Sequence, residues 1–168
     1  MKQFQILIDK LTDNITNGLL YILIVLIVLV FSSVFFRYIF NMSYIIVQEI
    51  IMYLHALIFM FGISYALKEN SHVKIDVLYN TLNKRTQRVI SIAGLVSFIL
   101  PTALFIIYIS IDMVTQSWMI LEGSSEAGGL NLVFILKSLI PISGVLIFLQ
   151  GISAVSYTHL TLPTILLV

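Results

Sequence analysis

The sequence predicts an all-α integral membrane protein with four transmembrane helices. Hydrophobic residues make up 60% of the 168 residues and charged residues only 10%, whereas a soluble domain carries about 25% charged residues. The apolar residues gather in four segments, and each is long enough to cross about 30 Å of hydrocarbon. Lys and Arg concentrate in alternate connections between these segments, as they do in multi-span membrane proteins.

The four spans are expected at about 15–36, 45–66, 89–113 and 132–154. The first span carries no charged residue, and the second is interrupted only by Glu49 and His55. Pro101 lies inside the third span and Pro141 inside the fourth. Each proline removes a backbone hydrogen bond, so we expect these two helices to bend.

The chain before the first span, residues 1–17, repeats apolar residues at helical spacing. This pattern predicts a short amphipathic helix that lies in the membrane interface. A helical extension of the first span fits the pattern equally well. The apolar positions are Phe4, Leu7, Ile8, Leu11 and Ile15.

A second amphipathic segment separates spans two and three. Asn70 or Ser71 can cap a helix there, and the apolar residues that follow recur at spacings of three and four. We therefore expect a short helix on the cytoplasmic surface of the membrane. His72 and Asp76 are one turn apart and can pair across it. Two such residues are too few for a metal site.

The distribution of Lys and Arg predicts the orientation. The connection between spans two and three holds five of these residues, and the N-terminal segment holds Lys2 and Lys10. The first connection has only Arg37 and the third has none. Because positive charge favours the cytoplasmic side, both termini and the second connection are expected in the cytoplasm.

Polar residues inside a span usually face the bundle interior or a partner. Gln48, His55 and Gly62 are seven residues apart and line one face of the second span. His55 falls near the membrane midplane, where it is either a proton relay or substrate contact, or a neutral histidine that donates one hydrogen bond to a neighbouring helix. In the second case Gly62 would allow close helix approach.

The remaining polar candidates lie near the extracytoplasmic ends of the spans. Glu49 is in the first turns of span two, where the helix dipole favours a carboxylate. It is expected to be an interfacial anchor or to pair with Arg37, which lies just past span one. A contact of Glu49 with a partner subunit is the alternative. Trp118 is expected at headgroup depth. Lys137 can snorkel outward or meet an acidic residue of the third connection, Glu122 or Glu126.

Several functional classes are disfavoured by what the sequence lacks. A net charge of +1 gives no reason to expect a nucleic-acid partner. The chain has no cysteine and no facing pair of in-span histidines, which argues against thiolate or haem ligation. We therefore predict no cofactor and no metal site, and a chain that has the lipid bilayer as a partner.

The order of features resembles the small membrane subunit of tripartite ATP-independent periplasmic (TRAP) transporters, the DctQ family. The resemblance covers about residues 15–154 and depends on several stretches in order, since none is decisive alone. These are "FRYIFN" (36–41), Glu49 at the start of span two, "GISYALKENSHVKID" (62–76), "SW" (117–118), "EGSSEAGGL" (122–130) and "LKSLIPISGVLIFLQGIS" (136–153).

The resemblance implies a non-catalytic permease subunit in the bacterial inner membrane. In that family the small subunit pairs with and steadies a large multi-span subunit, which imports an organic acid or related small solute by symport with an ion gradient, and a periplasmic substrate-binding protein delivers the solute. Residues that set the fold or contact the partner would be Arg37, Glu49, Gly62, His72, Asp76, Trp118, Glu122, Gly128, Gly129, Lys137 and Pro141.

Two other functional classes remain open at this point. A stand-alone proton-coupled exporter would use Glu49 or His55, and a membrane-bound redox or lipid-modifying enzyme would need reactive groups that the sequence does not offer. The chain is expected to form one four-span domain, residues 1–154. Residues 155–168, "VSYTHLTLPTILLV", carry no Lys or Arg and include Pro163, and we interpret them as a run-on or cloning-derived tail.

Overall fold

A computed structural model of the protein describes residues 2–69 and 83–160. These residues contain no strand and consist almost entirely of helices joined by short connections. Four helical stretches are long and apolar enough to cross a membrane, which confirms the predicted all-α membrane fold. The helices are α1 (Lys2–Phe40), α2 (Ile45–Lys68), α4 (Lys84–Gly94), the π-helix η1 (Leu95–Ile99), α5 (Leu100–Met119) and α6 (Val133–Leu160).

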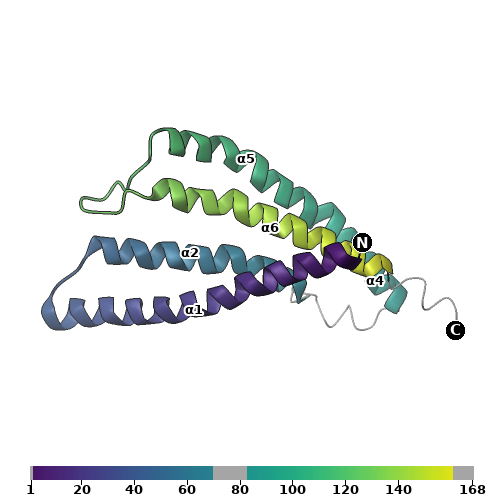
Figure 1. Ribbon diagram of the computed structural model, residues 1–168, viewed down its shortest axis with the longest axis horizontal. Coiled ribbons are helices and arrows are strands. Elements are labelled where there is room, and N and C mark those ends of the chain that lie inside the picture. The colour runs from purple at the N-terminus through teal and green to yellow at the C-terminus, as the bar shows by residue number, and fades with distance from the viewer. Residues whose placement is uncertain (1, 70–82, 161–168) are drawn as a thin grey trace.

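The long helices form two hairpins that lie side by side (Figure 1). One hairpin pairs α1 with α2 and the other pairs α5 with α6. The short connections within the hairpins lie at one end of the bundle, which we call the loop end. The start of α1 and the end of α6 lie at the other end, the terminus end (Figure 1). Helix α6 packs against α5, α2 and α1, so it is the central element of the fold.

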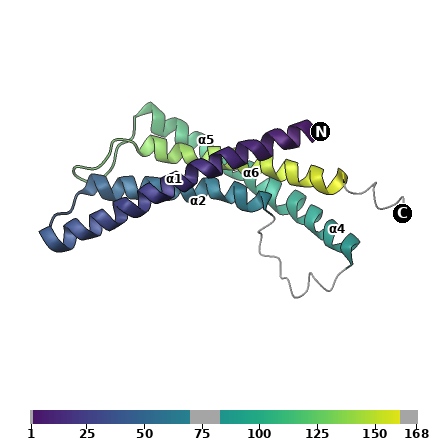
Figure 2. The same cartoon turned by 60° about the horizontal axis from the view of Figure 1, so that its bottom comes forward.

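The N-terminal segment forms no separate helix. It is the first part of α1, which runs without a break for 39 residues and crosses α2 toward α6 (Figure 2). The helical extension of the first span is therefore the correct alternative. Its inner face is also unexpected, because Gln5 and Thr12 are buried while Leu7 is 67% exposed.

The third span contains an irregular turn where Pro101 disturbs the helix. The five residues of η1 precede α5, and Pro101 is the second residue of α5. Proline has no N–H to donate and crowds the carbonyl four residues earlier. The backbone N–H of Leu100 donates to the carbonyl of Leu95, five residues back, so the disturbance is absorbed as a π-helical turn. Pro141 stays inside α6, which continues to Leu160.

Small side chains fill the contact between α5 and α6. Ala103, Ser110 and Ser117 are seven residues apart on α5 and almost fully buried. On α6, a Cβ added at Gly144 would lie 2.8 Å from the Ile107 side chain and 3.3 Å from the Ala103 carbonyl oxygen. Small residues allow this close approach of backbones in a membrane, where lipid offers no hydrophobic drive for helices to associate.

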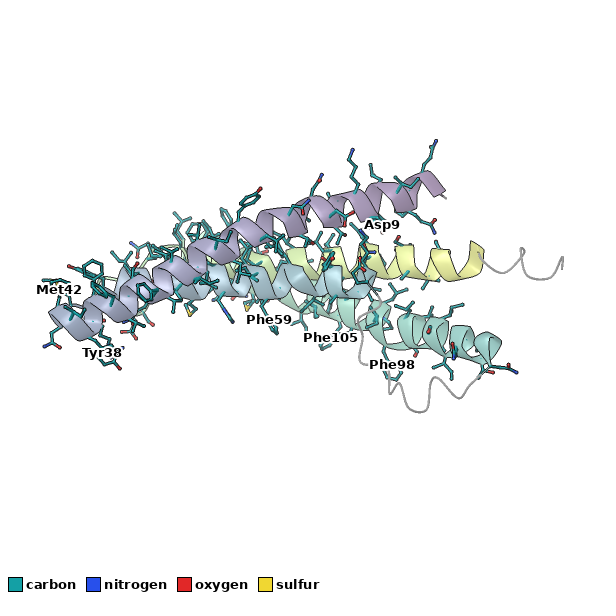
Figure 3. All side chains as sticks on the ribbon, turned by 90° about the horizontal axis from the view of Figure 1, so that it is seen from below. Asp9, Tyr38, Met42, Phe59, Phe98 and Phe105 are labelled. Atoms are coloured by element: carbon teal, nitrogen blue, oxygen red, sulfur yellow. The ribbon has the colours of Figure 1, made fainter. Side chains whose placement is uncertain are left out.

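The outer faces of the helices are strongly apolar and exposed. No more than 33% of the apolar window of any span is buried, and Figure 3 shows side chains projecting along the whole length of the bundle. Among them Tyr38 is 81% exposed and Phe98 71%. Such a surface requires lipid or another membrane protein to cover it. The segment expected to form the interfacial helix, with His72 and Asp76, lies outside the described residues.

Candidate functional site

Glu49 joins the two hairpins at the loop end. It is the fifth residue of α2, and its side chain is buried. The hydroxyl of Ser124 donates to its Oε1, and the backbone N–H of Leu130 donates to its Oε2. Both carboxylate oxygens are thus occupied, and the connection between α5 and α6 is fastened to the start of α2.

The expected pairing of Arg37 with Glu49 is wrong. Arg37 is exposed near the end of α1, and the ion pairs among the described residues do not include it. The reason is that Glu49 points toward the α5–α6 connection, which supplies two donors, rather than toward its own hairpin. Charge proximity along the chain suggested the wrong partner.

Two glycines shape the connection that binds Glu49. Gly128 has a φ of +83°, a backbone conformation that residues with a Cβ rarely adopt. At Gly129 the limit is space, because an added Cβ would lie 2.6 Å from Oε1 of Glu49. The two positions therefore need glycine for different reasons, one for its backbone angle and one for its small size.

Glu122 forms the second polar contact at the loop end. Its Oε2 accepts hydrogen bonds from Nζ of Lys137 at 2.5 Å and from the hydroxyl of Ser117 at 2.6 Å. The structure thus places Lys137 against Glu122 rather than Glu126, whose side chain is exposed. The hydrogen bond from Lys137 has the largest effect on the pKa of the Glu122 carboxyl, and together with that from Ser117 it holds this pKa below its ordinary value.

Trp118 bridges α5 and α6 beside this contact. Its indole Nε1 donates to the hydroxyl oxygen of Ser138 at 2.8 Å, and its ring meets that of Phe134 edge to face at 4.7 Å. The side chain is 49% exposed, so one part of the ring packs while another part faces outward. This is the amphipathic arrangement that favours tryptophan at membrane interfaces.

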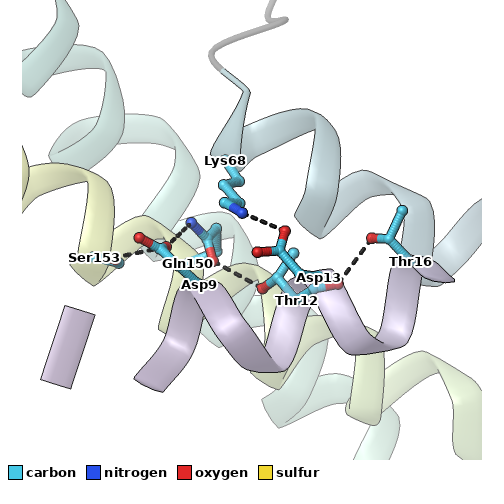
Figure 4. Close-up of polar contacts among 7 residues, drawn as sticks. All are labelled: Asp9, Thr12, Asp13, Thr16, Lys68, Gln150 and Ser153. Atoms are coloured by element: carbon cyan, nitrogen blue, oxygen red, sulfur yellow. Dashed lines mark hydrogen bonds and ion pairs between the residues drawn. The ribbon is translucent and has the colours of Figure 1, made fainter. Parts of the chain in front are cut away.

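A second polar cluster joins three helices at the terminus end (Figure 4). Lys68, at the end of α2, pairs with Asp13 of α1. Gln150 of α6 accepts a hydrogen bond from Thr12 at 2.9 Å and donates to Asp9 at 3.1 Å. The hydroxyl of Ser153, also on α6, donates a longer hydrogen bond to Asp9 at 3.4 Å.

Sequence reasoning missed this terminus-end cluster. The available signal was a polar pair within the fourth span, Gln150 and Ser153, because polar side chains in a span seek partners. The acidic residues of α1, Asp9 and Asp13, were the matching groups at the same end of the bundle. They lie in the segment before the first span, whose helical pattern does not show which face meets another helix, so a contact with α6 was not predicted.

The face of α2 that carries Gln48, His55 and Gly62 differs from both clusters, because these residues do not join α2 to another helix of the described chain. Gln48 donates to the hydroxyl of Ser43 at 2.8 Å. His55 is exposed, and it makes no hydrogen bond within the part of the chain that the structure describes. A Cβ added at Gly62 would meet no atom within 4 Å. The expected hydrogen bond and close helix approach therefore do not occur among residues 2–69 and 83–160.

The described residues offer no set of three metal-ligating side chains close together.

The protein-family model for the DctQ component of tripartite ATP-independent periplasmic transporters matches residues 26–159, which is most of the chain. The protein belongs to the DctQ family. A DctQ chain is a component of a transporter and not an enzyme. The comparison with curated proteins gave no match.

The DctQ match bears on the two polar clusters differently. It includes every loop-end residue described above, from Glu49 to Lys137. At the terminus end it includes Lys68 and Gln150 but not Asp9, Thr12 or Asp13, which precede residue 26. The match ends at residue 159, within the segment 155–168. The contacts that fasten the N-terminal part of α1 thus involve residues outside the matched region.

Proposed function

We propose that this chain is the small, non-catalytic membrane subunit of a TRAP-type secondary transporter. It pairs with a large multi-span subunit that carries the solute, an organic acid or related small molecule, by symport with an ion gradient. A periplasmic binding protein supplies the solute. The termini face the cytoplasm, in keeping with the Lys residues at the terminus end and the positive-inside rule.

The observation that carries this proposal is that both carboxylate oxygens of Glu49 already accept hydrogen bonds from within the chain. A carboxylate that moves protons or binds a solute needs an open side, whereas this one is buried and accepts hydrogen bonds from Ser124 and Leu130. Its contacts hold two hairpins together. A scaffold role fits this arrangement and leaves solute binding to another chain.

A stand-alone exporter that uses Glu49 or His55 is not favoured by the same geometry. Glu49 lies at the loop end of α2, and His55 lies on the exposed face of the same helix. One side chain is buried against the other hairpin and the other is exposed on the outside, so they do not line one path across the bundle.

Transport in proteoliposomes tests the scaffold role. We expect solute uptake only when this chain, the large subunit and the binding protein are all present, and co-purification of the two membrane chains. Glu49→Gln replaces one acceptor oxygen by an NH2 group, so it should reduce the amount of assembled complex while uptake per assembled complex stays unchanged. Glu126→Gln, which alters an exposed acid of the same connection, is the matched control.

Solute flux carried by this chain alone would contradict the proposal. So would a Glu49→Gln complex that assembles fully and transports nothing, because that result would place Glu49 in the transport chemistry.

A further inference from the structure

One exposed stripe of α2 carries a polar group in the middle of the membrane. The exposed positions Gln48, Met52, His55, Phe59 and Ile63 follow one another at spacings of three and four, so they form a continuous strip along one side of the helix. Gly62 lies beside Ile63 with open space around it. The buried Glu49 and Ser64 face the bundle instead.

His55 cannot reach water from this stripe. It is the eleventh of the 24 residues of α2, which places it about 15 Å from the start of the helix at 1.5 Å per residue. An imidazole is too short to cover that distance by snorkelling. An ionisable side chain at this depth is costly in lipid and normally faces protein.

We propose that this α2 stripe is the docking face for a transmembrane helix of the large subunit. The inference depends on the proposed function, since it names the surface through which the two subunits pair. The partner helix supplies a hydrogen-bond acceptor, a Ser, Thr, Asn or Gln oxygen or a free carbonyl, for the N–H of His55. It approaches most closely at Gly62, where the absent side chain leaves room for another backbone.

Two features of the molecule favour this occupant over lipid. Lipid chains offer no acceptor for His55, and Gly62 lies seven residues from His55 on the same face, so a helix that binds His55 can also approach closely there. The aromatic side of α1 provides a contrast, because Phe31, Phe35, Phe36 and Phe40 are exposed there and their rings contact one another. Lipid can cover that apolar side without leaving a polar group unpaired, whereas on the α2 stripe it would leave His55 without a hydrogen-bond partner.

Two pairs of variants test the face by co-purification with the large subunit. Gly62→Leu should lower the recovery of the large subunit by about tenfold, as expected from a clash at an interface. Gly18→Leu is the control, because Gly18 is also a helical glycine with no atom near its missing Cβ. His55→Leu should cause a similar loss, and His55→Gln, which keeps an N–H donor, should retain most of the recovery.

Labelling identifies the occupant directly. The chain has no cysteine, so a photoreactive probe on Phe59→Cys reports only on this stripe. Cross-linking to the large subunit supports the proposal. Cross-linking to a second copy of this chain, or to lipid alone, overturns it, as does equal recovery for Gly62→Leu and Gly18→Leu. If the wild-type chain fails to bind the large subunit, the proposed function falls together with this inference.

Discussion

Single residues at the end of α5 determine which charged groups meet. Leu121 has a φ of 47°. This left-handed conformation is usually adopted by glycine, because in other residues it brings the Cβ too close to a backbone carbonyl oxygen. The backbone N–H of Glu122 then donates to the carbonyl of Ser117 at 3.0 Å, which closes the helix in the manner of a Schellman cap. This turn brings the Glu122 carboxylate beside Lys137.

The Glu122 contact predicts a dependence of stability on pH. Hydrogen bonds from Lys137 and Ser117 hold the pKa of Glu122 below its ordinary value. Its stabilising contribution is therefore fully present above the unfolded-state pKa of about 4.3 and disappears as the pH falls through the lower folded-state pKa. Thermal unfolding of the purified chain across this acidic range should show the loss.

Glu122→Gln should be less stable than the wild type at neutral pH, and the difference should vanish in acid. Glu126→Gln is the control, because its side chain is exposed. A difference between Glu122→Gln and the wild type that stays constant through the acidic range would contradict this assignment.

Elements pack closely where their facing residues are small. The heptad spacing of Ala103, Ser110 and Ser117 keeps one edge of α5 against α6, and Gly144 lies opposite it. An approach this close depends on missing side chains rather than on large interlocking ones. The hairpin should accordingly be sensitive to added volume at the glycine and tolerant of changes on its outer face.

Gly144→Leu tests this packing in the isolated chain. The new side chain would overlap Ile107 and the Ala103 carbonyl, so we expect a loss of about 1–3 kcal/mol in the free energy of unfolding, the usual cost of overpacking. Gly62→Leu should leave the stability of the isolated chain nearly unchanged because its surroundings are open. Thermal unfolding in detergent measures both, and equal losses would contradict the assigned packing.

The sequence predicted elements better than contacts. Hydropathy located all four spans because the length of an apolar run is a local property. The partners of Glu49 lie 75 and 81 residues away along the chain, so no local pattern could identify them. For residues 3–17 the helical period was visible, but it does not tell which face meets protein, and Leu7 proved to be exposed where Thr12 is buried.

The whole molecule is held together by polar contacts at its two ends. Glu49 links the hairpins at the loop end, and Gln150 links α6 to α1 at the terminus end. Between them the helices meet mainly through small and apolar side chains. A frame fastened at both ends is consistent with the scaffold role proposed above.

Gln150→Leu tests the terminus-end link. It leaves the half-buried Asp9 and the buried Thr12 without their bonds to the Gln150 amide. A buried group left unsatisfied, here the Thr12 hydroxyl, costs about 1–3 kcal/mol. Hydrogen exchange should become faster in the first turns of α1 and stay unchanged near Glu49. Gln116→Leu is the control, because Gln116 is exposed and bonds only within its own helix. Unchanged exchange in α1 would show that other contacts hold this segment.

The length of α1 has a consequence for the surrounding lipid. Its 39 residues measure roughly 58 Å, whereas a bilayer with its headgroups is about 40–45 Å thick. An upright α1 would project Phe4 and Leu7 into water, although both are exposed on its outer side. The same segment carries Asp9, Lys10 and Asp13, so a tilt can bring its apolar face to the headgroup level while the charged groups keep their contact with water. Because α1 packs against α2 and α6, any tilt of α1 in the membrane tilts the rest of the bundle with it.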